Sequence, residues 1–329
     1  MRRKNKARAL AVVLLMSMTV SGCKLGNTEV VVNSGFSGNE VFKIKDEVCT
    51  LSEARVFLAN YQNIYANMYG VNLWKHKFKN NELESYVKDI TVSQLAQIMA
   101  MDFLAAEKEI SLTEEEQSKV KEAAKAYYDS LNDTEKEYMH VSESDIEKLY
   151  SRYGLANKLY TFLTGDVNAE VSDDDARVME AARIYVTDEN KANEIQNQIN
   201  SGVDFMSLAG TYNEASEIEV AFGRNDVPKE VEEVVFSLEN EQISGKIAAD
   251  NGWYFIKCIN NYNQELTDAN KSVILEQRRK EAFDDVYSEF LEELPAEFNE
   301  EVWEEVEIET DKEITTDSFF KTYEKYCNW

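Results

Sequence analysis

Apolar residues recur at helical spacing over most of the chain between residues 41 and 175. Residues 41–49 instead alternate between apolar and polar side chains, which predicts a single half-buried strand. Thr50 and Glu53 then form a capping-box pair, and the apolar residues after them fall on one face of a helix. Three further helices are predicted. The first covers about residues 81–109, the second starts at Thr113 with Glu116 as its capping partner, and the third runs from Ser142 or Ser144 to Leu163. This part of the chain is therefore predicted to be helical.

The pattern changes near residue 171, where strands and short helices begin to alternate. Residues 173–175 are consecutive aspartates, but the ligand spacing and closing glutamate of an EF-hand calcium loop are missing, so a helix start is predicted. Strands are predicted over 181–186 and 252–259, and helices over 190–201, 205–212 and 228–238, with Pro228 at the first helical position. A long helix over 267–294 and a strand over 302–308 follow, whereas the pattern does not place the aromatic residues 319–329.

The amino terminus has the order of features found in secreted proteins. Residues 1–8 carry five positive charges, and residues 9–20 are an apolar run too short to span a bilayer, which predicts a signal peptide over residues 1–22. Residues 20–23, Val-Ser-Gly-Cys, resemble the bacterial lipobox, which implies that Cys23 is lipidated and becomes the first mature residue. Residues 23–40 are then expected to be a tether to the extracytoplasmic side of the cell membrane. An ordinary secretory signal with a chance cysteine is the alternative.

The charge of the chain excludes some partners. The 62 acidic residues outnumber the 35 basic ones, for a net charge of −27. Loss of the five basic residues of the leader leaves 30 basic residues and a net charge of −32. Such a field repels phosphate backbones and anionic headgroups. We therefore expect no nucleic-acid partner and no docking to membranes through basic patches.

The sequence lacks the common signatures of metal, nucleotide and nucleophile chemistry. The four cysteines show no CxxC spacing, and His76 and His140 have no second nitrogen or sulfur ligand three or four residues away. The GxGxxG, GxxxxGK[ST], HExxH and GxSxG patterns do not occur. No metal site and no cofactor are therefore predicted.

The segment from about 178 to 262 resembles the parvulin-type (PpiC-type) peptidyl-prolyl isomerase domain. Five stretches carry this resemblance in the family's order, at residues 181–186, 197–212, 222–238, 241–247 and 252–259. The signal, the capped helices before this segment and the long helix after it resemble the PrsA and SurA class of extracytoplasmic foldases.

The resemblance to that class implies the fold. We expect a mainly α protein in which a helical chaperone domain is built from both ends of the chain, with an α+β parvulin-like domain inserted. The expected boundaries are 41–175 for the first helical part, 176–263 for the insert and 264–295 for the long helix, with the acidic and aromatic tail 296–329 unassigned.

The resemblance also implies a substrate pocket, with Phe222, Phe236, Tyr254 and Arg183 as its candidate residues. Parvulins typically carry a histidine in the first strand, where this chain has Arg183, and another in the last strand, where it has Tyr254. The loop 213–221 is short and lacks glycine, and Asp226 stands roughly where the family has a methionine. Catalytic residues therefore remain unassigned, and Phe222 and Phe236 could equally be core residues.

Loss of the histidines does not by itself exclude catalysis. Rotation about an X-Pro bond faces a barrier of about 18–20 kcal/mol but makes and breaks no covalent bond. The expected function is a membrane-anchored extracytoplasmic foldase or chaperone that binds unfolded or partly folded secreted polypeptides and carries a degenerate parvulin-like domain. An active peptidyl-prolyl isomerase and a non-catalytic structural or binding lipoprotein are the alternatives.

Overall fold

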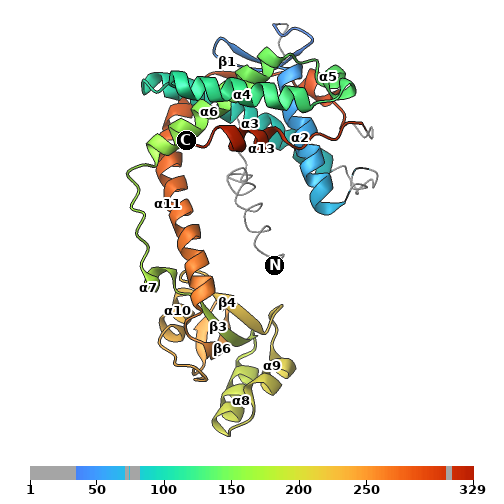
Figure 1. Cartoon of the computed structure of the whole chain (residues 1–329). Coiled ribbons are helices and arrows are strands. Elements are labelled where there is room, and N and C mark those ends of the chain that lie inside the picture. Colours follow the sequence, from blue (N-terminus) through green and yellow to red (C-terminus); the bar gives the residue numbers. More distant parts are fainter. Residues whose placement is uncertain (1–34, 71–73, 75–81, 309–312) are drawn as a thin grey trace. The chain divides into compact units, whose positions relative to one another are not determined.

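The structure, a computed structural model, describes residues 35–70, 74, 82–308 and 313–329 (Figure 1). The predicted signal peptide, Cys23 and most of the predicted tether lie outside these residues. The chain forms two compact units, one from Met1–Gly165 and Ala282–Trp329 and the other from Asp166–Glu281. The predicted architecture, a helical unit made from both ends of the chain with an α+β insert, is confirmed. The inserted unit is longer at both ends than the predicted 176–263.

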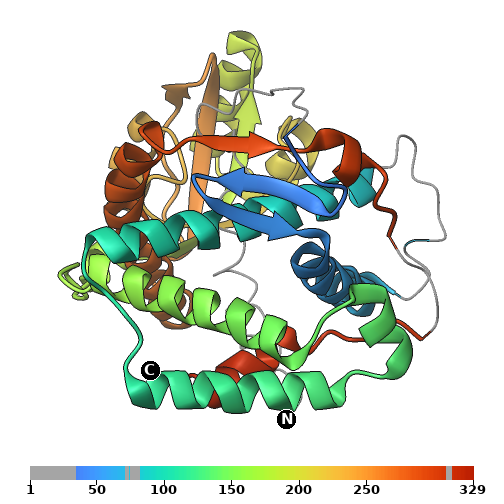
Figure 2. The same ribbon diagram turned by 90° about the horizontal axis from the view of Figure 1, so that it is seen from above.

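The helical unit begins with a β-hairpin where the alternating pattern predicted a single strand. Strand β1 (Glu40–Ile44) pairs antiparallel with β2 (Glu47–Thr50), and the prediction of one strand over 41–49 is wrong. Lys45 reverses the chain with a left-handed φ of 51°. Strand β7 (Ala296–Phe298) pairs with the other edge of β1, which gives the order β2-β1-β7 (Figure 2). The alternation breaks at residues 45–47, three consecutive exposed polar residues, and the chain turns there.

The helices of this unit begin where their capping residues predicted. Helix α2 (Leu51–Tyr69) starts at the Thr50–Glu53 capping box, and α4 (Glu114–Ser130) at that of Thr113 and Glu116. Ser142 rather than Ser144 caps α6 (Glu143–Leu163), and α3 (Glu82–Glu107) lies between α2 and α4 in the chain. The short helix α5 (Asp133–Met139), capped by Asn132, was not predicted.

The carboxyl-terminal residues complete the core of the helical unit. The predicted strand over 302–308 is wrong, because Asn299 caps a short helix, α12 (Glu300–Glu304), that buries Trp303. Helix α13 (Phe319–Tyr326) buries Phe319, Phe320 and Tyr323 in the same core. The long helix α11 (Gln264–Glu292) contains the boundary between the two units.

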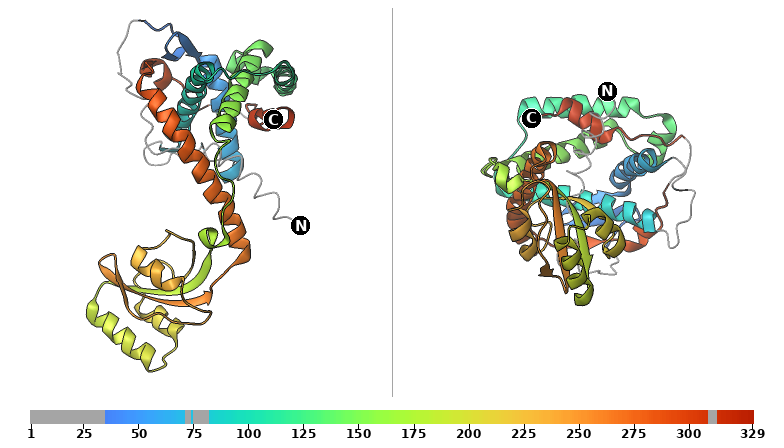
Figure 3. Two further views of the ribbon diagram at one scale, coloured as in Figure 1. Left: turned by 90° about the vertical axis from the view of Figure 1, so that its left-hand side faces the viewer. Right: turned by 90° about the horizontal axis from the view of Figure 1, so that it is seen from below.

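The inserted unit is an antiparallel sheet of order β4-β3-β6-β5 covered on both faces (Figure 3). Its strands are β3 (Met179–Val186), β4 (Glu219–Phe222), β5 (Ile247–Ala249) and β6 (Gly252–Asn260). Side chains alternate along β3, so Met179 and Ala181 face α10 (Lys229–Val235), while Ala182 and Ile184 face α8 (Glu189–Asn200) and α9 (Phe205–Tyr212).

Two details of this unit differ from prediction. The helix start at the consecutive aspartates is a single turn, α7 (Asp173–Ala176), capped by Ser172. Pro228 is the residue before α10 rather than its first helical residue.

Among the described residues, none of the helices combines the length and apolar character that a membrane-spanning segment needs.

Candidate functional site

All four residues of the predicted pocket lie on the sheet face that α10 covers. Arg183 and Tyr254 come from the central strands, where Arg183 pairs with Ile256 and Tyr185 pairs with Tyr254. Phe222 ends β4, and Phe236 directly follows α10. The face therefore has an aromatic part, made by the two phenylalanines, and a polar part, made by Arg183 and the two tyrosines.

The two phenylalanines pack edge to face, with ring centroids 6.0 Å apart and planes inclined at 80°. Phe222 is 5% exposed and Phe236 8%, and both belong to the small core that includes Met179, Ala181 and Val231. Burying rings in this way stabilises the unit. Their packing role is therefore evident, and little of either ring faces solvent.

Two arginines that the sequence analysis did not single out cover Phe236. The guanidinium carbon of Arg224 lies 4.2 Å from the ring centroid and that of Arg177 lies 5.5 Å away, in cation–π geometry. Arg224 pairs with Asp174 at 2.9 Å and with Glu232 at 3.6 Å. The position of Arg224 over Phe236 depends on tertiary folding. The only sequence signal for this residue is that it directly follows the Phe-Gly pair at residues 222–223.

The polar part of the face is organised around the turn between β5 and β6. The hydroxyl of Tyr254 donates to the Asp250 carboxylate at 3.3 Å, and that of Tyr185 donates to the Asp250 carbonyl at 3.1 Å. Asp250 and Asn251 both have positive φ, as a two-residue type I′ turn requires. Burial and then the Asp250 carboxylate raise the pKa of Tyr254, so its phenol is neutral near pH 7.

Arg183 is held by the loop before β4. Its Nε donates to the carbonyl of Glu217 at 3.0 Å. Asp226 accepts from the backbone N–H of Gly223 at 2.7 Å. The carboxylate of Asp226 thus closes the turn before α10.

The short loop after α9 is fixed by its own side chains. Asn213 accepts a hydrogen bond from the backbone N–H of Tyr185 at 3.0 Å. The Glu214 carboxylate accepts from Lys191 and from the backbone and hydroxyl of Thr187. The Lys191 hydrogen bond is the main cause that lowers the pKa of Glu214 to about 2. The loop therefore holds Arg183 and Tyr185 in place without glycine.

The face offers cations and phenols but no imidazole. His140 ends α5 in the helical unit and His76 lies outside the described residues, so neither belongs to residues 166–281. Guanidinium groups donate hydrogen bonds and cannot accept them. The face can therefore donate to peptide carbonyls beside an aromatic ring, without a neutral acceptor of the imidazole type.

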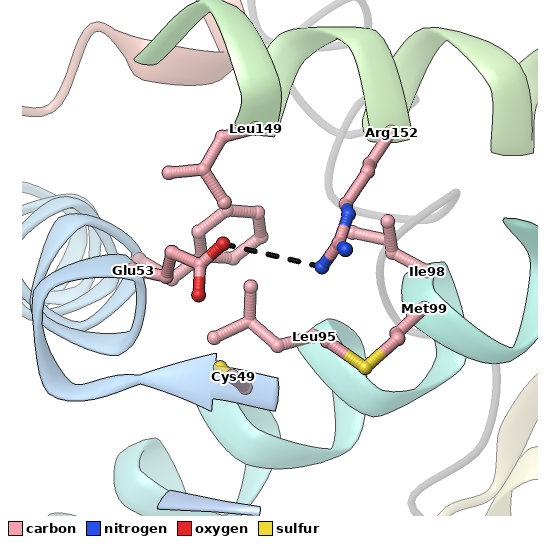
Figure 4. Close-up of a pocket in the computed structure, with 8 residues that line it drawn as sticks. Cys49, Glu53, Leu95, Ile98, Met99, Leu149 and Arg152 are labelled. Atoms are coloured by element: carbon pink, nitrogen blue, oxygen red, sulfur yellow. Dashed lines mark ion pairs between the residues drawn. The ribbon is translucent and has the colours of Figure 1, made fainter. Parts of the chain in front are cut away.

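A second polar cluster lies inside the helical unit. A guanidinium nitrogen of Arg152 in α6 lies 3.9 Å from a carboxylate oxygen of Glu53 (Figure 4). The same guanidinium lies 3.3 Å from the carboxylate of Asp102 and also pairs with Glu47. The cavity beside it, which Cys49 also lines, has a volume of about 10 Å³, enough for roughly one water molecule. Burial raises the pKa of Asp102 to about 7. The size of the cavity and the paired charges indicate a structural ion cluster, which no local sequence motif predicts.

Known proteins match both parts of the chain. Residues 169–260 match the family model described as "Rotamase: PPIC-type PPIASE domain". The foldase protein PrsA 3 of Bacillus anthracis is 23% identical over 219 residues, which cover 64% of this chain and 73% of that protein. PrsA 3 of Bacillus cereus is 30% identical over 128 residues, which cover 34% of this chain and 45% of that protein. The crystal structure of the Bacillus cereus peptidylprolyl isomerase PrsA aligns with a TM-score of 0.37 at 23% identity, over 74% of this chain and 92% of that chain.

These matches agree with the resemblance carried by the sequence motifs. They support a foldase or chaperone as the class of function. Residues 169–260 match the PPIC-type rotamase domain, and the chain that carries them is similar to the PrsA-type foldases.

Proposed function

We propose that this protein is a membrane-anchored extracytoplasmic foldase that acts by holding unfolded secreted polypeptides, and that its rotamase domain has little isomerase activity. The matched domain and the foldase names of the relatives support the foldase class. The weak activity follows from the sheet face, because Arg183 and Tyr254 stand where the resemblance places histidines. The acidic surface keeps the holder and its bound polypeptide soluble.

The observation that carries this proposal is that the polar groups of that face already form hydrogen bonds within the domain. The Tyr254 hydroxyl donates to Asp250, and Arg183 donates to the Glu217 carbonyl. Catalysis of bond rotation needs groups that bind the twisted amide better than the planar one. The Tyr254 hydroxyl must first give up its bond to Asp250, and the bond of Arg183 Nε fixes the direction of its guanidinium, which lowers the value of both groups for the transition state.

Cis/trans exchange of a proline-containing peptide tests the weak isomerase activity. We expect the full chain to accelerate exchange about 100-fold less than an ordinary parvulin at the same concentration, since one lost electrostatic group costs about 10²–10³ in rate. NMR exchange spectroscopy measures this rate directly. Acceleration equal to that of a parvulin, and abolished by Phe236→Ala, would contradict the proposal and establish an active isomerase.

Aggregation of a reduced, unfolded protein tests the holding activity in the same preparation. Light scattering should fall only when the chain approaches equimolar amounts, since a holder is consumed by its client. Proline-limited refolding should keep its rate. Suppression at substoichiometric amounts together with faster refolding would indicate catalysis, and no effect on either would indicate a structural or binding lipoprotein.

Substitution of Cys23 by serine tests the anchor, which the basic leader, apolar run and lipobox-like residues 20–23 support. The variant lacks the thiol that would carry the lipid, so we expect at least a tenfold larger soluble fraction or an unprocessed precursor. Membrane fractionation and mass spectrometry of the amino terminus measure both. Equal retention and equal processing of Cys23→Ser and Cys49→Ser, a control that changes a buried cysteine, would contradict anchoring at Cys23.

A further inference from the structure

The carboxyl-terminal segment, residues 313–327, lies in a groove formed by α2, α4, α5 and α6. Five side chains of the helical unit hydrogen-bond its main chain: Asn60, Asn63, Asn132, Glu135 and Tyr150. One oxygen of Glu135 accepts the backbone N–H groups of Thr315 at 2.8 Å and Thr316 at 2.7 Å. The groove thus binds the backbone of the segment and not only its side chains.

Hydrogen bonds to the backbone continue along the segment to the start of α13. Asn60 accepts the backbone N–H of Phe319 at 3.0 Å, and Tyr150 donates to the carbonyl of the same residue at 2.7 Å. Asn63 donates to the Thr316 carbonyl at 2.9 Å. Every peptide group can make such bonds, so these contacts do not depend on the sequence of the bound segment.

Two aromatic side chains of the segment, Phe319 and Phe320, add ring contacts to these backbone bonds. The ring of Phe319 stacks on Tyr150 at a centroid distance of 4.3 Å and also contacts Phe57 and Tyr127. Phe320 lies 5.3 Å from Phe57 and from Tyr61. Both rings are buried, so the groove has a slot suited to a pair of adjacent aromatic residues.

The groups that line the groove need an occupant. With the segment in place, Glu135 and Asn60 are 2% and 0% exposed, and the segment supplies hydrogen bonds to both. Departure of the segment would open these groups and the aromatic slot to water. Another extended backbone that carries aromatic residues can restore the same hydrogen bonds and bury the same apolar surface.

We propose that this groove is a binding site for unfolded polypeptide segments in which extended residues precede an aromatic pair, and that residues 313–329 occupy it as an internal competitor. This inference rests on the proposed holding function and names the site that performs it. A client segment replaces the backbone of residues 315–319 and places its own aromatic rings between α2 and α6. Release of the internal segment then controls how much client the chain holds.

Thr315→Pro loosens the internal segment without changing the residues of the groove. Thr315→Pro removes the N–H that Glu135 accepts, whereas Thr315→Ala keeps that N–H and is the matched control. Full-length chains are titrated with a fluorescent peptide of residues 313–329 carrying Cys327→Ser. We expect Thr315→Pro to bind it at least fivefold more tightly than the wild type or Thr315→Ala. A peptide that also carries Phe319→Ala and Phe320→Ala should not bind.

The unfolded client must compete for the same site. Reduced, carboxymethylated lactalbumin should displace the peptide from Thr315→Pro, and this variant should suppress aggregation at a lower ratio than Thr315→Ala. Equal peptide affinities of two folded variants, or displacement by the unlabelled peptide but not by lactalbumin, would overturn the inference. If the wild type holds clients and Thr315→Pro does not hold them better, the inference about this groove is overturned and the proposed function stands. If the wild type does not hold clients, the proposed function itself is contradicted.

If Thr315→Pro does not fold, hydrogen exchange in the wild type tests whether a client displaces the internal segment. Saturating lactalbumin should accelerate exchange of the Thr315, Thr316 and Phe319 amides at least fivefold, because the client replaces the bonds that protect them. The Phe255 amide of the inserted sheet serves as the reference. Unchanged exchange at the three tail amides would overturn the inference.

Discussion

Replacing Arg152 with methionine is expected to lower the free energy of unfolding of the helical unit by about 3–5 kcal/mol. The Glu53 side chain is 6% exposed, and Arg152 lies 3.9 Å from it and 3.3 Å from Asp102. Removal of the guanidinium leaves buried carboxylates without its compensating charge. Urea unfolding followed by circular dichroism measures the loss.

The matched control for this prediction is Lys148→Met. Lys148 pairs with the same Glu53 at 3.4 Å, but its side chain is 51% exposed, so screening by water should limit the loss to less than about 1 kcal/mol. Equal losses in the two variants would show that burial of the arginine does not decide the effect.

The stability of the helical unit is expected to fall as the pH rises from about 4 to 7, because of Asp102. Burial is the main cause that raises the pKa of its carboxyl from 3.8 to about 7. Between these values the folded state holds a proton that the unfolded state has released, so each unit of pH lowers the stability. The shift corresponds to a loss on the order of 2–4 kcal/mol, complete above about pH 7.

Comparison of Asp102→Asn with the wild type isolates this contribution. The variant does not titrate at this position, so its stability should fall less between pH 4 and 7. Glu107→Gln alters an exposed carboxyl on the same helix and should leave the wild-type slope unchanged. Equal slopes for Asp102→Asn and the wild type in urea titrations at several pH values would exclude Asp102 as the cause.

Sequence reasoning succeeded where the determining interactions are local. Thr50, Thr113 and Ser142 start their helices through bonds to residues three positions later, so the sequence alone contains both partners. The alternation along β3 likewise separates the two faces of the inserted sheet. Arg183 and Tyr254 share one face because of this alternation, whereas Phe236 reaches that face from the end of α10.

Sequence reasoning failed where a residue acts through a partner far along the chain. Arg224 reads as an ordinary surface arginine until the fold places it over Phe236. Glu135 lies in a helix that the pattern did not predict, and only the structure shows that one of its oxygens caps that helix while the other holds the tail.

The pairing of residues near both ends of the helical unit sets the order in which this protein can fold during synthesis. Asn299 bonds the carbonyl of Glu40, 259 positions earlier, and the last aromatic residues fill the same core. Residues 166–281 are complete before that core can close, and their folding brings its two halves nearer, which lowers the entropy cost of closure. Until residue 327 has emerged, the aromatic slot between α2 and α6 is unfilled, so the helical unit exposes apolar surface to other chains.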